Sequence, residues 1–132
     1  MGFEDDCRAV AEDRTALAEL RIVAPLLMAS ASPCGARAVV AALVPLTSLY
    51  GIQTRSEAEW KTFWKFYIDA LEALPLEALK RGIADYVGDA KSEFFPKPGP
   101  LKALCEAHAS GPRMAALRAK FTLEIANQRK GL

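Results

Sequence analysis

The chain has 132 residues, of which 52% are hydrophobic and 25% are charged, and its formal net charge is +1. This length and balance are typical of one globular domain that folds without a metal or a disulfide, and they exclude a disordered chain. Alanine is abundant and β-branched residues are sparse, so helix is favoured over sheet. We therefore predict an all-α protein, a compact bundle of five to six helices.

The charges are spread unevenly along the chain. Residues 1–30 hold six acids and three bases, whereas residues 97–132 hold two acids and seven bases. An acidic start and a basic end predict that the last segment meets a polyanion or an acidic protein surface. A solvated helix face explains the same pattern, and both interpretations stay open at this point.

The cysteines and the apolar stretches indicate a cytoplasmic protein. The chain has an odd number of cysteines, and they are widely spaced: Cys7, Cys34 and Cys105. This pattern predicts reduced thiols. The first residues are acidic where a secretory signal would be basic. Residues 22–54 hold a single charge, Arg37, but prolines interrupt them, which argues against a membrane span and predicts a buried pair of helices.

The first half of the chain predicts two helices. One begins near Glu4 and is ended or kinked by Pro25, because proline removes a backbone donor from a helix interior. The other begins at Ser32 and Pro33, a capping residue followed by proline. It ends at Gly51, because glycine readily adopts the left-handed conformation that closes many helices.

The third helix has the clearest signal, and the fourth follows it closely. Ser56 and Glu59 form a capping box, and apolar and aromatic residues then recur at helical spacing from Trp60 to Leu74. Pro75 begins the fourth helix, and Gly88 closes it. We assign its buried face to Leu76, Leu79, Ile83, Tyr86 and Val87, and its exposed ion pairs to Glu77–Arg81 and Arg81–Asp85.

The last third of the chain predicts a connector and two helices. Three prolines in residues 94–100 exclude a regular helix there, and a short helix follows from Pro100 until Gly111 and Pro112 break it. A basic amphipathic helix then covers residues 112–130, with four apolar residues facing inward: Met114, Leu117, Phe121 and Ile125. We assign residues 1–132 to a single helical domain with its core in residues 4–109.

The sequence holds no glycine-rich phosphate loop, no nucleophile elbow and no HExxH motif. Cys105 and His108 have the spacing of two metal ligands on one helix, and Cys7 and Cys34 would complete a zinc site. None of them belongs to a CxxC pair, however, and buried cysteines usually act as small apolar residues. We therefore predict no catalytic residue, no metal, no cofactor and no small-molecule substrate, and hence no enzyme.

Two other features each allow two interpretations. The aromatic cluster from Trp60 to Tyr67 is either domain core or a platform for nucleic-acid bases, and one continuous helical stripe favours core. Phe66 lies at the edge of this stripe and is expected to stay exposed. Residues 94–100 are either a rigid connector or a docking loop, and Lys97 projects into solvent in both cases.

The middle of the chain resembles a known family. The matching pattern, in chain order, is Tyr50, Trp64-x-x-Tyr67, Ala70-Leu71-x-x-Leu74-Pro75, Ala78-Leu79, Ile83-x-x-Tyr86, Phe95-Pro96 and a helix that opens at Leu101. Over about residues 45–107, it resembles the N-terminal helical domain of phage replicative-helicase loaders and inhibitors, also called replisome organisers. The resemblance implies a helical domain followed by a mobile C-terminal segment that contacts a hexameric helicase. This chain departs from the pattern by about 45 preceding residues and by a C-terminal segment that we predict to be helical.

We therefore expect a non-enzymatic, cytoplasmic phage or prophage DNA-replication accessory protein. It would bind a replicative helicase or another replication protein as a loader, adaptor or inhibitor, with at most a weak nucleic-acid contact and no membrane contact. The alternative is a small helical DNA-binding regulator that uses the same basic helix. The candidate partner-binding residues are Arg113, Arg118, Lys120, Arg129, Lys130, Lys97 and Phe66.

Overall fold

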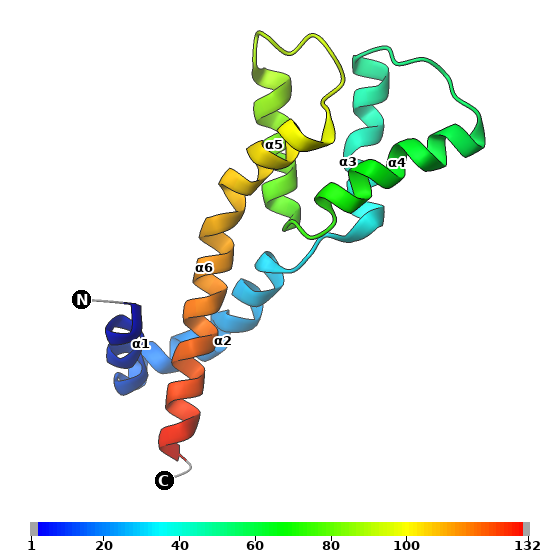
Figure 1. Cartoon of the computed structure of the whole chain (residues 1–132). Coiled ribbons are helices and arrows are strands. Elements are labelled where there is room, and N and C mark those ends of the chain that lie inside the picture. Colours follow the sequence, from blue (N-terminus) through cyan, green and yellow to red (C-terminus); the bar gives the residue numbers. More distant parts are fainter. Residues whose placement is uncertain (1–2, 131–132) are drawn as a thin grey trace. The chain divides into compact units, whose positions relative to one another are not determined.

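The computed structural model describes the backbone of residues 3–130 and the side chains of residues 3–128. This part of the chain forms six helices and no strand, which confirms the predicted all-α class (Figure 1). The helices are α1 (Phe3–Glu12), α2 (Arg14–Ala31), α3 (Gly35–Leu49), α4 (Glu57–Leu71), α5 (Leu76–Gly88) and α6 (Pro98–Lys130).

The helices belong to two compact units. The central unit, Ser32–Ser110, holds α3, α4, α5 and the first part of α6. The terminal unit consists of Met1–Ala31 and Gly111–Leu132, and so holds α1, α2 and the rest of α6. The sequence predicted one core in residues 4–109, but residues 4–31 group instead with the C-terminal segment. An apolar stripe shows that a helix has a face to bury, but it does not show which other helix covers that face.

The core of the central unit consists of leucines from four helices. Leu43, Leu71, Leu79 and Leu101 are fully buried, and Phe63 and Trp64 of α4 pack against this cluster. Tyr67 is buried, and its hydroxyl donates a 2.7 Å hydrogen bond to the carbonyl of Pro96. The aromatic stripe is therefore core, as the sequence favoured.

The start of α4 agrees with the sequence, and the start of α3 does not. The Ser56 hydroxyl accepts from the Glu59 backbone N–H at 3.2 Å, and a Glu59 carboxylate oxygen accepts from the Ser56 N–H at 3.3 Å. The helix predicted from Ser32 begins instead at Gly35. The Cys34 and Gly35 N–H groups donate to the Leu74 and Glu72 carbonyls at 2.8 and 3.0 Å, so a contact with the end of α4 sets this start. Gly51 closes α3 at φ +60°, as predicted.

The N-terminal segment is divided at a position that the sequence did not reveal. Asp13 separates α1 from α2, and its carboxylate accepts from the N–H groups of Thr15 and Ala16 at 2.9 and 3.1 Å. The helix does not end at Pro25, which lies inside α2. Nor is α2 a fully buried helix, because Ile22 and Leu26 are 75% and 69% exposed.

Helix α6 overturns three further predictions. It begins at Pro98, within the proline-containing residues 94–100 that the sequence predicted not to be helical. It continues through Gly111 and Pro112, although the boundary between the two units falls there. Its C-terminal part buries small residues, Ala119, Thr122 and Ala126, whereas Met114 and Leu117 are exposed. The inward-facing assignment of those two residues is therefore wrong. Small side chains allow a close packing of helices that large ones would prevent, and residue size alone pointed to the wrong face.

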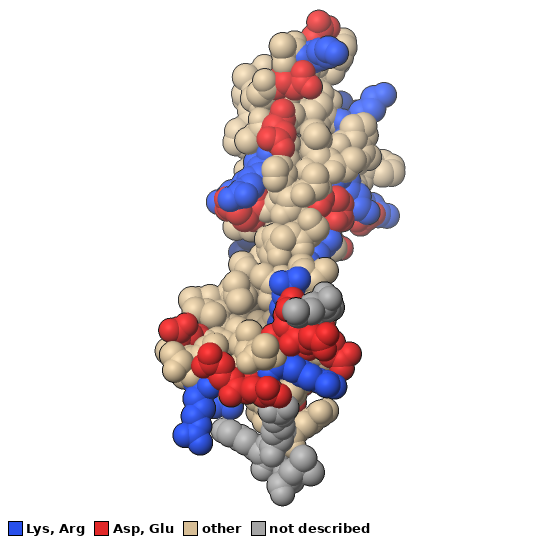
Figure 2. Space-filling model, turned by 90° about the vertical axis from the view of Figure 1, so that its left-hand side faces the viewer, with Lys and Arg blue, Asp and Glu red and all other residues tan. Residues whose placement is uncertain are grey.

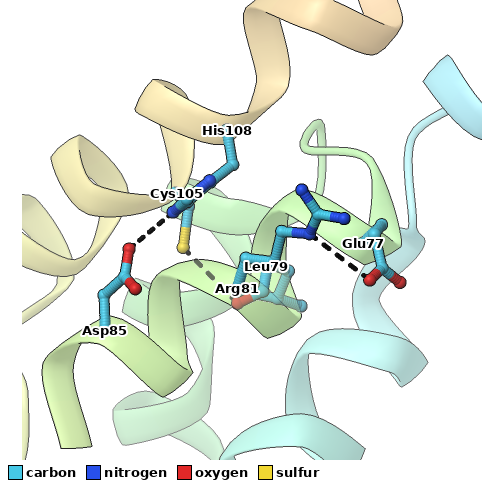
Figure 3. Close-up of polar contacts among 6 residues, drawn as sticks. All are labelled: Glu77, Leu79, Arg81, Asp85, Cys105 and His108. Atoms are coloured by element: carbon cyan, nitrogen blue, oxygen red, sulfur yellow. Dashed lines mark hydrogen bonds and ion pairs between the residues drawn. The ribbon is translucent and has the colours of Figure 1, made fainter. Parts of the chain in front are cut away.

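The exposed side of α5 also differs in part from the prediction. Leu79 and Ile83 are buried as expected, but Leu76 and Val87 are exposed, and Ala78 and Gly82 are buried in their place. The Glu77–Arg81 ion pair is present at 3.5 Å. The Arg81–Asp85 pair is not, because Asp85 binds His108 of α6 at 2.5 Å instead (Figure 3).

Helices α5 and α6 approach each other closely at Gly82. A Cβ atom at this position would overlap the Cys105 sulfur and lie 2.7 Å from its Cα and 2.8 Å from its backbone nitrogen. The two nearest backbone atoms belong to a helix and cannot move aside as a flexible side-chain tip would. Only glycine therefore allows α5 and the first part of α6 to pack at this distance.

We expect Gly82→Ala to lower the free energy of unfolding by about 1–3 kcal/mol, the usual cost of overpacking a core. This cost outweighs the roughly 0.5–1 kcal/mol that alanine gains over glycine inside a helix. The measurement is urea unfolding, followed by tryptophan fluorescence. The matched control is Gly88→Ala on the same helix, where nothing lies within 4 Å of the added Cβ. Equal stabilities of the two variants would show that the close approach does not constrain the fold.

Candidate functional site

The residues considered as metal ligands have other partners in the structure. The Cys105 thiol is fully buried and donates to the Leu79 carbonyl at 3.7 Å, and His108 is paired with Asp85 (Figure 3). Cys7 belongs to the terminal unit and Cys34 to the central unit. Among the described residues, no three His, Cys, Asp or Glu side chains are arranged to hold a metal ion.

Burial also makes the cysteines of the central unit poor nucleophiles and poor ligands. Removal from water raises the pKa of the Cys105 thiol from 9.0 to about 11, with smaller contributions from Glu106 and Asp85. Desolvation by burial likewise raises the pKa of Cys34, whose sulfur lies 3.6 Å from the Leu71 carbonyl. Both thiols therefore stay protonated near neutral pH, whereas thiol chemistry requires the thiolate.

The candidate partner-binding residues are divided between the two units. Arg113, Arg118 and Lys120 are exposed on α6 in the terminal unit. Lys97 and Phe66 are exposed in the central unit, as predicted. The side chains of Arg129 and Lys130 lie outside the described residues. These candidates therefore belong to separate surfaces.

The first surface, the α6 outer face, consists of Arg113, Met114, Leu117 and Lys120. Their spacings of three, four and seven residues bring them to one side of a helix. Met114 and Leu117 are 49% and 53% exposed, so two large apolar side chains face solvent between two bases. The sequence predicted the two bases as partner-binding residues but placed Met114 and Leu117 in the core.

Arg118 lies at the edge of this face and also helps to pack the terminal unit. Its guanidinium carbon is 5.5 Å from the centre of the Phe3 ring, a cation–π distance. Phe3 in turn packs against Phe121, with 5.5 Å between ring centres. The Cys7 thiol donates to the Arg118 carbonyl at 3.8 Å, and the Thr122 hydroxyl donates to it at 2.8 Å. Arg118 therefore joins α1 to α6 and is not only a surface charge.

The terminal unit is nearly balanced in charge. The bases of residues 111–132 outnumber the acids by four, but the acids of residues 1–31 outnumber the bases by three. Three of these acids, Glu4, Asp5 and Asp6, occupy the first turn of α1. Figure 2 shows acidic side chains gathered together on the face in view, with basic side chains beside them. The unit therefore lacks the strong net positive charge that a polyanion-binding unit usually carries.

The second surface, the α4 outer face, consists of Arg55 and four side chains of α4: Lys61, Thr62, Lys65 and Phe66. Phe66 is 64% exposed, as the edge of the stripe predicted. Two hollows open on this face, of about 480 and 360 Å³, and both are lined by Thr62. Neither hollow is lined by a cluster of titratable groups with catalytic geometry, so the surface suits binding.

No family model, no curated protein and no solved structure matches this chain. In the part of the chain that the structure describes, no helix has the length and the apolar character needed to cross a bilayer.

The burial of the cysteines predicts how fast alkylating reagents modify them. At pH 8 about one Cys105 thiol in a thousand is ionised, against about one in ten for a thiol of ordinary pKa. We expect iodoacetamide to modify the half-buried Cys34 first and Cys105 at least about a hundredfold more slowly than an unburied thiol. Peptide mass spectrometry over time measures this order, and labelling in urea is the control in which all three react. Native labelling of Cys105 as fast as Cys34 would contradict the structure.

Proposed function

We propose that this chain is a non-enzymatic phage or prophage DNA-replication accessory protein that binds a replicative helicase in the cytoplasm. The α6 outer face is the binding surface. The protein acts as a loader, adaptor or inhibitor by binding one state of the helicase ring more tightly than another, because a ligand shifts an equilibrium only through such a difference.

The observation that carries the proposal is the exposure of Met114 and Leu117 between Arg113 and Lys120. Interfaces combine an apolar centre with a polar rim, and large side chains at the centre supply most of the binding energy. These two apolar residues are already on the surface, so a partner reaches them without unfolding the terminal unit. The resemblance implies a mobile C-terminal segment, whereas this segment is helical here. A helix holds Met114 and Leu117 on one face, which is a reason for the difference.

The partner class rests on the resemblance to helicase loaders and inhibitors within residues 45–107. The charge of the terminal unit supports a protein partner over duplex DNA, because the acids of residues 1–31 offset most of the basic charge of residues 111–132. Phosphate backbones are bound mainly through accumulated positive charge. A protein surface needs fewer charges, since buried apolar contacts supply the affinity.

We expect Met114→Glu combined with Leu117→Glu to weaken helicase binding by about 10–100-fold, equivalent to about 1.4–2.7 kcal/mol. The melting temperature should change little, because both side chains are exposed. Calorimetric titration against a purified bacterial hexameric helicase measures the affinity. Val87→Glu on the exposed side of α5 is the control and should bind normally. No helicase binding by the wild type would refute the partner, and normal binding by the double variant would refute the surface.

The salt dependence of binding separates a helicase partner from DNA. If only three bases contacted phosphates, affinity for duplex DNA would fall about forty-fold between 50 and 200 mM salt. Helicase binding through apolar side chains should fall much less, because salt does not screen such contacts. We therefore expect weak, salt-sensitive DNA binding beside helicase binding that persists at 200 mM salt. Tight DNA binding without helicase binding would favour the DNA-binding regulator.

A further inference from the structure

Phe66 differs from the other aromatic residues of α4. Four of them pack on one another. The ring centre of Phe63 lies 5.3 Å from that of Trp60, 4.9 Å from that of Trp64 and 5.0 Å from that of Tyr67. Phe66 makes no ring contact of this kind within the described residues and is 64% exposed. An exposed phenylalanine forgoes free energy of burial, which a partner that covers it would recover.

Two hollows flank the same stretch of α4. One is lined by Arg55, Ala58, Glu59, Thr62, Phe63 and Phe66, and it is about 480 Å³ in volume. The other is lined by Lys61, Thr62, Lys65 and Ile68, and it is about 360 Å³. Because both share Thr62, they lie side by side across the helix. Together they offer one apolar position beside the Phe66 and Phe63 rings and a second position beside two lysines.

The charges that line these hollows favour an acidic occupant. Lys61 and Lys65 are exposed, and neither forms an ion pair in the part of the chain that the structure describes. The Arg55 guanidinium carbon lies 4.7 Å from the centre of the Phe63 ring and 5.2 Å from that of Trp60, which orients the cation at the edge of the first hollow. The one carboxylate of the lining, Glu59, already accepts from the Ser56 N–H in the capping box.

We propose that the α4 outer face binds an acidic peptide segment of a partner protein. An apolar side chain of the peptide packs on Phe66 in the first hollow, and neighbouring carboxylates pair with Lys61 and Lys65. This site lies in the central unit and does not depend on the α6 outer face or on a helicase partner. Charge complementarity selects the partner, and the apolar anchor supplies affinity.

A single-stranded nucleic acid fits the same face less well. Such ligands stack successive bases on several exposed rings along a continuous positive groove. Here only Phe66 is exposed among the rings of α4, and Glu57 and Asp69 interrupt the positive charge along the helix. A peptide places a few carboxylates at discrete positions, so it can reach the two lysines and avoid the acids.

The test is selection of a random 12-residue peptide library, displayed on phage, against the full chain. We expect the selected peptides to carry Asp or Glu within one helical turn of Phe, Leu or Trp. Synthetic copies are then titrated against the chain, and the emission of its two tryptophans, Trp60 and Trp64 on α4, reports binding. Lys61→Glu combined with Lys65→Glu should weaken binding at least tenfold, as should Phe66→Ala.

The control variant combines Lys80→Glu with Lys91→Glu, which changes two exposed lysines of the same unit and should bind normally. Failure to enrich acidic residues would overturn the proposal, as would equal binding by the Phe66→Ala and wild-type chains. Tighter binding of a single-stranded oligonucleotide than of any selected peptide would replace it with a nucleic-acid site. Loss of peptide binding in the Met114→Glu and Leu117→Glu variant would move the site to α6 and refute it.

Discussion

The close approach of α5 to α6 at Gly82 is the constraint on which the central unit depends. Because no Cβ separates the helices there, α6 passes close to α5 at Cys105. This packing places the Cys105 thiol beneath the Leu79 carbonyl and brings His108 within reach of Asp85. The burial that raises the pKa of Cys105 and the pairing of Asp85 with His108 therefore both occur where these two helices meet.

The sequence predicted well the features that depend on neighbouring residues. The capping box at Ser56, the left-handed Gly51 and the aromatic stripe of α4 each arise within a few residues of chain, and each was found. The start of α3 was missed because distant carbonyls at the end of α4 satisfy its first N–H groups. Gly82 gave no signal either, since a glycine inside a helical pattern does not show which helix approaches it.

The same distinction applies to the candidate surfaces. The position of Phe66 at the edge of the helical stripe was enough to predict its exposure. The prolines beside Lys97 were enough to predict that Lys97 projects into solvent. Met114 and Leu117 were assigned to the core because large apolar residues are usually buried. The alanines on the opposite side of α6 are buried instead, and this preference depends on how closely α1 packs against the helix. An exposed apolar pair can be recognised only when its neighbours in space are known.

The discontinuous make-up of the terminal unit has a consequence for the order of events during synthesis. Ser32–Ser110 is synthesised as one continuous stretch, so all residues of the central unit are made before Gly111–Leu132. The terminal unit is complete only when Gly111–Leu132 has joined the first 31 residues. Units that are complete early in translation generally fold first. The α4 outer face therefore needs residues from one continuous stretch alone, whereas the unit that carries the α6 outer face needs residues from two separate segments.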